Sequence, residues 1–172
     1  MTRAFPAWLL CVGATVACAA PPSAPEAASA TPGPATDVVE LSAADIRDRL
    51  TSGAFTSRAL TQAYLDRIAA IDDAGPRLDA VIELNPSALQ VADALDAERR
   101  SGKVRSALHG MPILIKDNID IAGLVNSAGS LALADHRPAQ DAFMVQRLRE
   151  AGAVILGKTN LSEWANFRST RS

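Results

Sequence analysis

Three short apolar segments, separated by longer amphipathic stretches, constrain the fold of this chain more than any other feature of the sequence. They are AVIEL at 80–84, MPILI at 111–115 and AVILG at 153–157. Apolar runs of this length beside turn-forming residues are typical of buried β-strands. Strand, helix and strand in alternation predict right-handed crossovers, and therefore an α/β fold with a largely parallel sheet covered by helices. Pro112 fits such a sheet only at the first residue of a strand or at an edge.

The first two helices have recognisable ends. Ser42, with an acidic residue three positions later, has the pattern of a capping box, and Gly53 would end that helix. A second helix is expected to begin at residue 56 or 57 and to break in the DDAGP turn at 72–76.

Two further helices are expected between the strands. Asn85 and Pro86 have the order of a cap followed by a first helical residue, and Gly102 would end that helix. Asp141 is the expected cap of the last helix, which would end at Gly152.

The first 18 residues have the features of an export signal. Arg3 supplies positive charge, and residues 4–17 form an apolar stretch shorter than the about 20 residues of a membrane-spanning helix. Small residues follow, which fits cleavage at 19–20. Cys18 also resembles the lipidated cysteine of a bacterial lipobox, although Thr15 replaces the usual leucine. Lipidation of Cys18 and plain cleavage are therefore equal alternatives.

A tether is expected behind this signal. Between residues 19 and 36, every residue except Glu26 is Ala, Pro, Ser, Thr or Gly, a composition that cannot bury a core. We therefore expect a signal at 1–18, a disordered tether at 19–38 and a folded domain at 39–172. The expected location is outside the bacterial cytoplasm, either periplasmic or anchored to a membrane through the N-terminus.

Charge and composition exclude several classes of function. The net charge is −2, and Lys and Arg are interleaved with Asp and Glu, as at 96–105, so no nucleic-acid partner is expected. Cys11 and Cys18 both lie in the first 18 residues, and His109 and His136 are the only histidines. This set is too small for a zinc site, and no metal is expected.

Two lysines follow apolar strands directly, and the pattern alone does not separate them. In open α/β sheets, ligands bind beyond the carboxyl ends of the strands, where Lys116 and Lys158 are expected. Most strand-end lysines simply extend their charge into water. The aliphatic residues before Lys116 favour a buried base for its side chain, and a desolvated lysine can act as a neutral base. Asp117 and Asn118 would hold it in place, unless Asp117 pairs with it and keeps it charged.

A second polar loop, NSAGSLAL at 126–133, lies between the last two strands. Gly129 permits a close backbone approach, and Ser127 and Ser130 offer hydroxyl groups beside it. Serine and glycine form turns in all proteins, so an ordinary loop is the alternative here.

Longer motifs in a linked order resemble the amidase signature family, and among its members those of the peptide amidase type. They are YLDRIAAID, LDAVIELNP, GMPILIKDNID, NSAGSLAL and the run DAFMVQRLREAGAVILGKTNLSEWANFRS. The resemblance covers the chain from Leu41 to its last residue. It implies the family's mixed sheet covered by helices, and hydrolysis of carboxamides, including C-terminal peptide amides, without a metal or organic cofactor.

The resemblance also implies roles for the two lysines. Lys116 would be the base at the end of a Ser, cis-Ser, Lys triad, and Lys158 would be structural. A neutral amine can accept the proton of an attacking serine through a second hydroxyl, while backbone N–H groups of a glycine-rich loop stabilise the oxyanion. The surroundings of the base would be Asp117, Asn118, Ser127, Gly129 and Ser130.

The family's two triad serines lie in a Gly/Ser-rich segment that follows the FRS stretch, and the sequence ends at Ser172 without one. We therefore expect a fold that is incomplete at its C-terminus and a chain that is inactive alone. Two other functions stay open: a non-catalytic remnant or interaction module, and an aminoacyl-tRNA amidotransferase A-type subunit. The export signal argues against this last function, because tRNA is charged in the cytoplasm.

Overall fold

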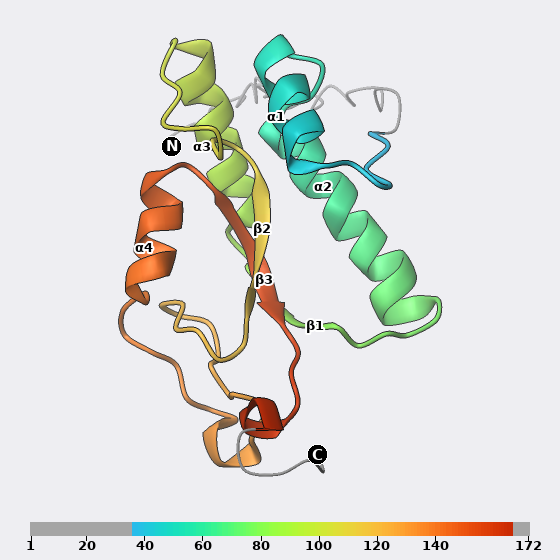
Figure 1. Cartoon of the computed structure of the whole chain (residues 1–172), viewed down its shortest axis with the longest axis vertical. Helices are drawn as coiled ribbons and strands as arrows, with labels where there is room; N and C mark the ends of the chain where they lie inside the picture. The colour runs from blue at the N-terminus through green and yellow to red at the C-terminus, as the bar shows by residue number, and fades with distance from the viewer. Residues whose placement is uncertain (1–35, 167–172) are drawn as a thin grey trace, which may run out of the picture. The chain divides into compact units, whose positions relative to one another are not determined.

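The computed structural model describes residues 36–166, which form a mixed α/β unit (Figure 1). The export signal, Cys18 and nearly all of the tether lie outside the described residues. The four α-helices are α1 (Ala43–Ser52), α2 (Ser57–Arg67), α3 (Ala88–Arg100) and α4 (Phe143–Glu150). The strands are β1 (Val81–Leu84), β2 (Pro112–Lys116) and β3 (Val154–Thr159). Within 36–166, no helix has the length and apolar content needed to cross a membrane.

The sheet is mixed, with the strand order β1-β3-β2. β2 runs parallel to β3, with Pro112 opposite Val154 and Lys116 opposite Thr159. β1 runs antiparallel to β3 on its other side. The mixed sheet of the family is therefore confirmed, but the first strand–helix–strand step does not give a parallel pair. Pro112 is the first residue of an edge strand, as expected, where its missing N–H costs no ladder hydrogen bond.

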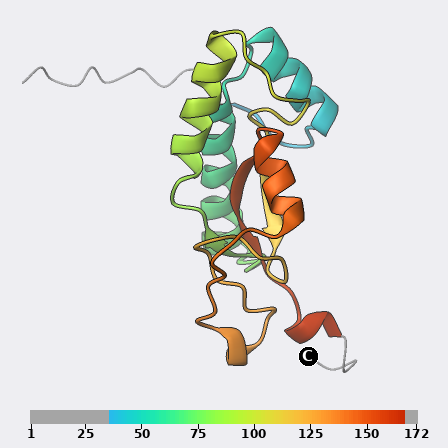
Figure 2. The same cartoon turned by 90° about the vertical axis from the view of Figure 1, so that its left-hand side faces the viewer.

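Both faces of β3 are buried, which explains its continuous apolar run. Figure 2 shows α2 and α3 on one side of the sheet and α4, in orange, on the other. Val154 and Leu156 pack with Leu95 of α3, and Ile155 packs with Val145 of α4. Successive strand residues point to opposite faces, so a central strand covered on both sides needs apolar residues throughout.

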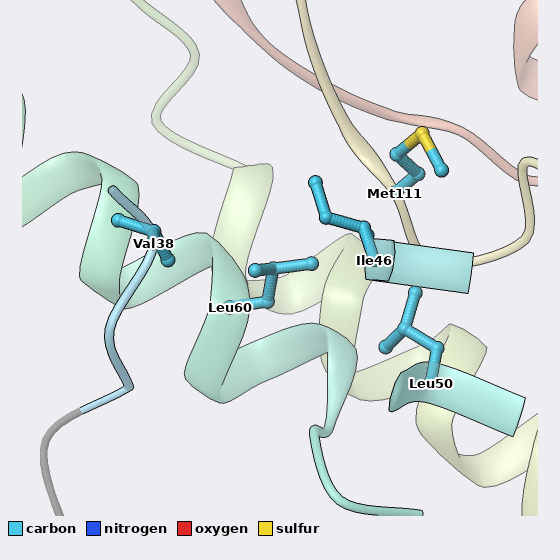
Figure 3. Close-up of a cluster of buried hydrophobic side chains, with 5 residues drawn as sticks. All are labelled: Val38, Ile46, Leu50, Leu60 and Met111. Atoms are coloured by element: carbon cyan, nitrogen blue, oxygen red, sulfur yellow. The ribbon is translucent and has the colours of Figure 1, made fainter. Parts of the chain in front are cut away.

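A separate cluster joins α1 to α2 (Figure 3). It consists of Val38, Ile46, Leu50, Leu60 and Met111. Val38 was expected at the end of the tether and is instead 8% exposed in this cluster. The packed part of the chain therefore begins just before residue 39.

The helix ends follow the sequence in α1 and α2. Ser42 and Asp45 form the expected capping box, and Gly53 ends α1 with φ of 77°. The Thr56 side chain caps α2, which continues as a π-helical turn, Ile68–Ala74, into the expected break.

The expected caps of the other two helices are wrong. α3 begins at Ala88, and the Asn85 side chain accepts a hydrogen bond from Ser87 in the turn before it. Asp141 does not cap α4, because its carboxylate accepts hydrogen bonds from Ala122 N and Arg149 Nε. Its oxygens instead connect the start of α4 to the 119–124 turn and to the helix's last turn.

Candidate functional site

Lys116 lies at the carboxyl end of β2, with its side chain exposed. The preceding residue, Ile115, is 4% exposed and packs under α4, so the backbone that carries Lys116 is anchored in the core. Among the described residues, no ion pair includes Lys116. The sequence-based expectation that the aliphatic part of this side chain is buried is therefore not met within residues 36–166, where Lys116 is exposed.

Lys158 has the opposite environment. It is 0% exposed, its Nζ donates to the carbonyl oxygen of Ile119 at 2.7 Å, and it lies 3.3 Å from Asp117 Oδ1. An ammonium group away from water requires such partners. The two lysines that the sequence pattern could not separate are therefore distinguished by burial, and Asp117 pairs with Lys158 rather than with Lys116.

Asp117 is fully buried and connects three segments of the chain. Its backbone N–H donates to Thr159 O at 3.0 Å, and its carbonyl oxygen accepts from Ala128 N at 3.0 Å. Its Oδ2 accepts hydrogen bonds from the backbone N–H of Ser127, at 3.0 Å, and from the Ser127 hydroxyl. The end of β2, the end of β3 and the loop at 126–130 are thereby held together.

All backbone N–H groups of residues 127–130 already donate hydrogen bonds. Ser127 and Ala128 donate to Asp117, Gly129 donates to Ser127 Oγ, and Ser130 donates to Ser127 O. Both serine hydroxyls donate to carboxylates, Ser127 to Asp117 and Ser130 to Glu163 Oε1 at 2.8 Å. In this conformation the loop therefore offers no free N–H for an oxyanion and no unengaged hydroxyl for nucleophilic attack.

Gly129 is required by its surroundings. Its φ is +71°, and a Cβ atom at this position would lie 2.7 Å from the carbonyl oxygen of Leu161. The close approach is completed by the bond from Trp164 N to Ala128 O, of 2.8 Å. The sequence-based expectation that Gly129 permits a tight backbone approach is confirmed, and the partner is the segment at 161–164.

A hollow of about 830 Å³ lies beside this loop. It is lined by Asn118, Asn126, Ala128, Leu133, His136, Trp164 and Ala165. Asn118 belongs to the expected surroundings of Lys116, but Asn126, His136 and Trp164 were not predicted. Their positions depend on the backbone bond from Asn126 N to His136 O and on the turn at 163–166, neither of which leaves a pattern in the sequence. Among the residues described, no three or more His, Cys, Asp or Glu side chains converge as a metal site requires.

Comparison with known proteins identifies the family. The family model described as Amidase matches residues 59–172, which is more than half of the chain. The chain belongs to the amidase family. A putative amidase of Arthroderma benhamiae is 40% identical to this chain over 157 residues, covering 78% of the chain and 26% of the relative. The A-type subunit of the glutamyl-tRNA(Gln) amidotransferase of Salinispora arenicola is 42% identical over 136 residues, which cover 78% of the chain and 27% of that relative.

The fold is also similar to solved structures of this family. The native peptide amidase of Stenotrophomonas maltophilia matches with a TM-score of 0.74 and 60% sequence identity, over 78% of this chain and 27% of that one. The chain therefore spans about a quarter of the length of the relatives it matches. The resemblance to the amidase signature family is confirmed, and the role of Lys116 stays a prediction.

Proposed function

We propose that this chain is the N-terminal part of an enzyme that hydrolyses carboxamide C–N bonds, with Lys116 as the base. The similarity to a peptide amidase favours C-terminal peptide amides as the substrate class. The observation that carries the proposal is the difference between the two strand-end lysines. Lys158 is buried and paired with Asp117, whereas Lys116 is exposed at the carboxyl end of β2. Asn118, two residues later, lines the adjacent hollow.

In the proposed reaction, a serine hydroxyl attacks the amide carbonyl carbon while its proton passes through a second hydroxyl to neutral Lys116. Because a lysine must be removed from water to act as a neutral base, the proposal requires that a part of the whole enzyme outside residues 36–166 covers Lys116. The tetrahedral intermediate then expels the amine, which takes the proton back from Lys116 and leaves an acyl-serine. Water attacks this acyl-serine and gives its proton to Lys116 by the same route, and the carboxylic acid leaves as the serine oxygen regains the proton. The engaged hydroxyls of Ser127 and Ser130 argue against both as relay groups. The two serines of the relay are accordingly assigned to a part of the whole enzyme outside residues 36–166.

A chimera tests this proposal. The segment of the Stenotrophomonas maltophilia peptide amidase that matches 78% of this chain is replaced by the corresponding residues of the chain. We expect the chimera to release ammonia from a peptide amide. Lys116→Ala should lower kcat/KM more than about 100-fold, because general-base catalysis typically contributes at least that factor.

The control is Lys103→Ala, which removes an exposed lysine in an ion pair with Glu98 and should leave the rate unchanged. Equal rates for the parent chimera and Lys116→Ala would exclude Lys116 as the base. A folded chimera without activity would favour the alternative of a non-catalytic remnant or interaction module.

The similarity to an A-type amidotransferase subunit supports a second candidate function, action on charged tRNA together with partner proteins. The two candidates differ in what the reaction requires. Hydrolysis of a peptide amide by the chimera without tRNA or added partner proteins supports the first candidate. A rate that appears only when charged tRNA and the partner proteins are added supports the second.

We also propose that the protein is exported and is either periplasmic or attached to a membrane through Cys18. The support is the charged, apolar and small-residue order of residues 1–20. Export also favours the hydrolase over the tRNA-dependent candidate.

A further inference from the structure

Asp117 and Lys158 form a buried ion pair that the proposed reaction does not use. Both side chains are 0% exposed, and Asp117 Oδ1 lies 3.3 Å from Lys158 Nζ. Removing two opposite charges from water is costly, and apolar residues of similar size are often at least as stable in such places. A pair of this kind therefore calls for an explanation beyond overall stability.

The hydrogen bonds of Asp117 indicate what the pair does. One carboxylate oxygen faces Lys158, while the other accepts both the N–H and the hydroxyl of Ser127. Its backbone adds bonds to Thr159 and Ala128. These contacts connect the residue directly after Lys116 to β3 and to the loop that borders the hollow.

Lys158 completes the arrangement from the opposite side. Its ammonium donates to the carbonyl oxygen of Ile119, in the turn that follows β2, at 2.7 Å. It thus holds this turn and supplies the positive charge that allows a carboxylate to remain at position 117 away from water. A neutral side chain at 158 would leave that carboxylate without a counter-charge.

We propose that Asp117 is a positioning residue, which fixes the backbone of Lys116 and the loop at 126–130 as one unit with Lys158 as its counter-charge. A lysine side chain is long and flexible, so the direction of its ammonium depends on a fixed backbone and surroundings. The loop contributes Asn126 and Ala128 to the wall of the hollow, and the same bonds hold Asn118 nearby. The catalytic meaning of this inference rests on the proposed function, whereas the local coupling does not.

Amide hydrogen exchange of the 172-residue chain, followed by NMR, tests the coupling without any activity measurement. In Asp117→Ala, we expect exchange at the amides of residues 117, 127 and 128 to accelerate at least about 10-fold. The Ser127 amide loses its carboxylate acceptor directly, and the bonds from residue 117 N to Thr159 O and from Ala128 N to the residue 117 carbonyl open more often once the carboxylate no longer holds the loop. The Leu60 and Val91 amides, bonded to Thr56 O and Ser87 O in distant helices, are the internal controls and should change less than about 2-fold.

A neutral pair provides the rescue. In Asp117→Asn combined with Lys158→Met, the asparagine oxygen can still accept from Ser127 and no charge remains buried. Exchange at 127 and 128 should return to within about 3-fold of the parent. Lys158→Met alone leaves the carboxylate without a counter-charge and should accelerate both amides.

Several results would overturn the inference. The first is unchanged exchange at the amides of residues 117, 127 and 128 in Asp117→Ala, and the second is an equal acceleration at the Leu60 and Val91 amides. The third is exchange at residues 127 and 128 in the neutral-pair variant that is as rapid as in Asp117→Ala. If Asp117→Ala does not fold, the neutral pair and Ser127→Ala decide the question. Ser127→Ala removes only the hydroxyl, so it should accelerate the Gly129 amide, which donates to that hydroxyl, and leave the residue 117 amide protected. A failed activity test of the chimera would not alter these results.

Discussion

Glu98 is the residue whose ionisation the fold changes most clearly. Its carboxylate accepts two hydrogen bonds from the Arg105 guanidinium, from Nε at 2.7 Å and from Nη2 at 2.5 Å. This paired contact is the main reason that the pKa of Glu98 falls from 4.5 to about 2. Arg105 also donates to the carbonyl oxygen of Arg149, so the pair connects the end of α3 to the last turn of α4.

This shift predicts a loss of stability in acid. Above pH 4.5, Glu98 is ionised in both the folded and the unfolded chain, and the full contribution of the pair is present. As the pH falls from 4.5 to about 2, the unfolded chain takes up a proton before the folded one does, so the free energy of unfolding decreases. Glu98→Gln should lower stability at neutral pH and flatten this decrease.

Urea unfolding at pH 7, 4 and 3 measures the effect. The matched control is Glu150→Gln, which removes the carboxylate of an exposed pair with Arg147 and should leave the acid profile close to that of the parent. Parallel profiles for the parent and Glu98→Gln would contradict the assignment.

The two strand-end lysines show where prediction from sequence fails at this scale. Lys116 and Lys158 both follow an apolar run and precede polar residues, so a local pattern describes them equally. Their burial is decided by partners that fold back from elsewhere, the Ile119 carbonyl and the Asp117 carboxylate. From the sequence, only the family resemblance distinguishes the two lysines, because it implies a structural role for Lys158. The burial of Lys158 agrees with that role.

At the scale of elements, the caps of α1 and α2 and the three apolar strands could be predicted because their signals are local, whereas the expected caps of α3 and α4 were wrong because those side chains bond elsewhere. The direction of β1 could not, since an apolar tetrapeptide followed by a helix is compatible with either strand direction. The hollow was also unpredictable, because it depends on the packing of the 126–130 loop against residues 161–164. That packing has one local requirement, the glycine at 129.

Two glycines allow this requirement to be measured. Gly129 and Gly123 both have positive φ, +71° and +85°, but a Cβ atom would collide with Leu161 O only at Gly129. Gly123→Ala should cost about 1–2 kcal/mol of unfolding free energy from backbone strain alone. Gly129→Ala should cost about 1–3 kcal/mol more, because the loop and the 161–164 segment must move apart.

Thermal and urea unfolding of both variants give the comparison, and Trp164 fluorescence reports on the local separation. Equal decreases in unfolding free energy for the two variants would show that the loop at 126–130 can move away from residues 161–164 without further loss of stability. The packing would then not be what holds this side of the hollow.

At the scale of the whole molecule, the folded unit and the N-terminal segment are expected to have different tasks. The packed residues begin at Val38, and the proposed tether before them has about 20 residues. The composition of residues 19–36 predicts a segment that cannot bury a core, so a change at Cys18 is expected to leave the packing of the folded unit unaffected.

The mature N-terminus tests this arrangement. In a bacterial host, we expect mass spectrometry to find a protein that begins either at Cys18 carrying lipid or close to Ala19 or Ala20 without it. A lipid anchor predicts recovery in the membrane fraction and release into the soluble periplasmic fraction by Cys18→Ala, since the apolar acyl chains supply the membrane affinity. The same replacement should leave the unfolding free energy of the folded unit unchanged, because the hydrophobic clusters of this unit are built from residues 38–156. An unmodified alanine at the mature N-terminus would exclude lipidation but remain consistent with export. A cytoplasmic protein that keeps residues 1–17 would exclude both lipidation and export, and would strengthen the tRNA-dependent alternative.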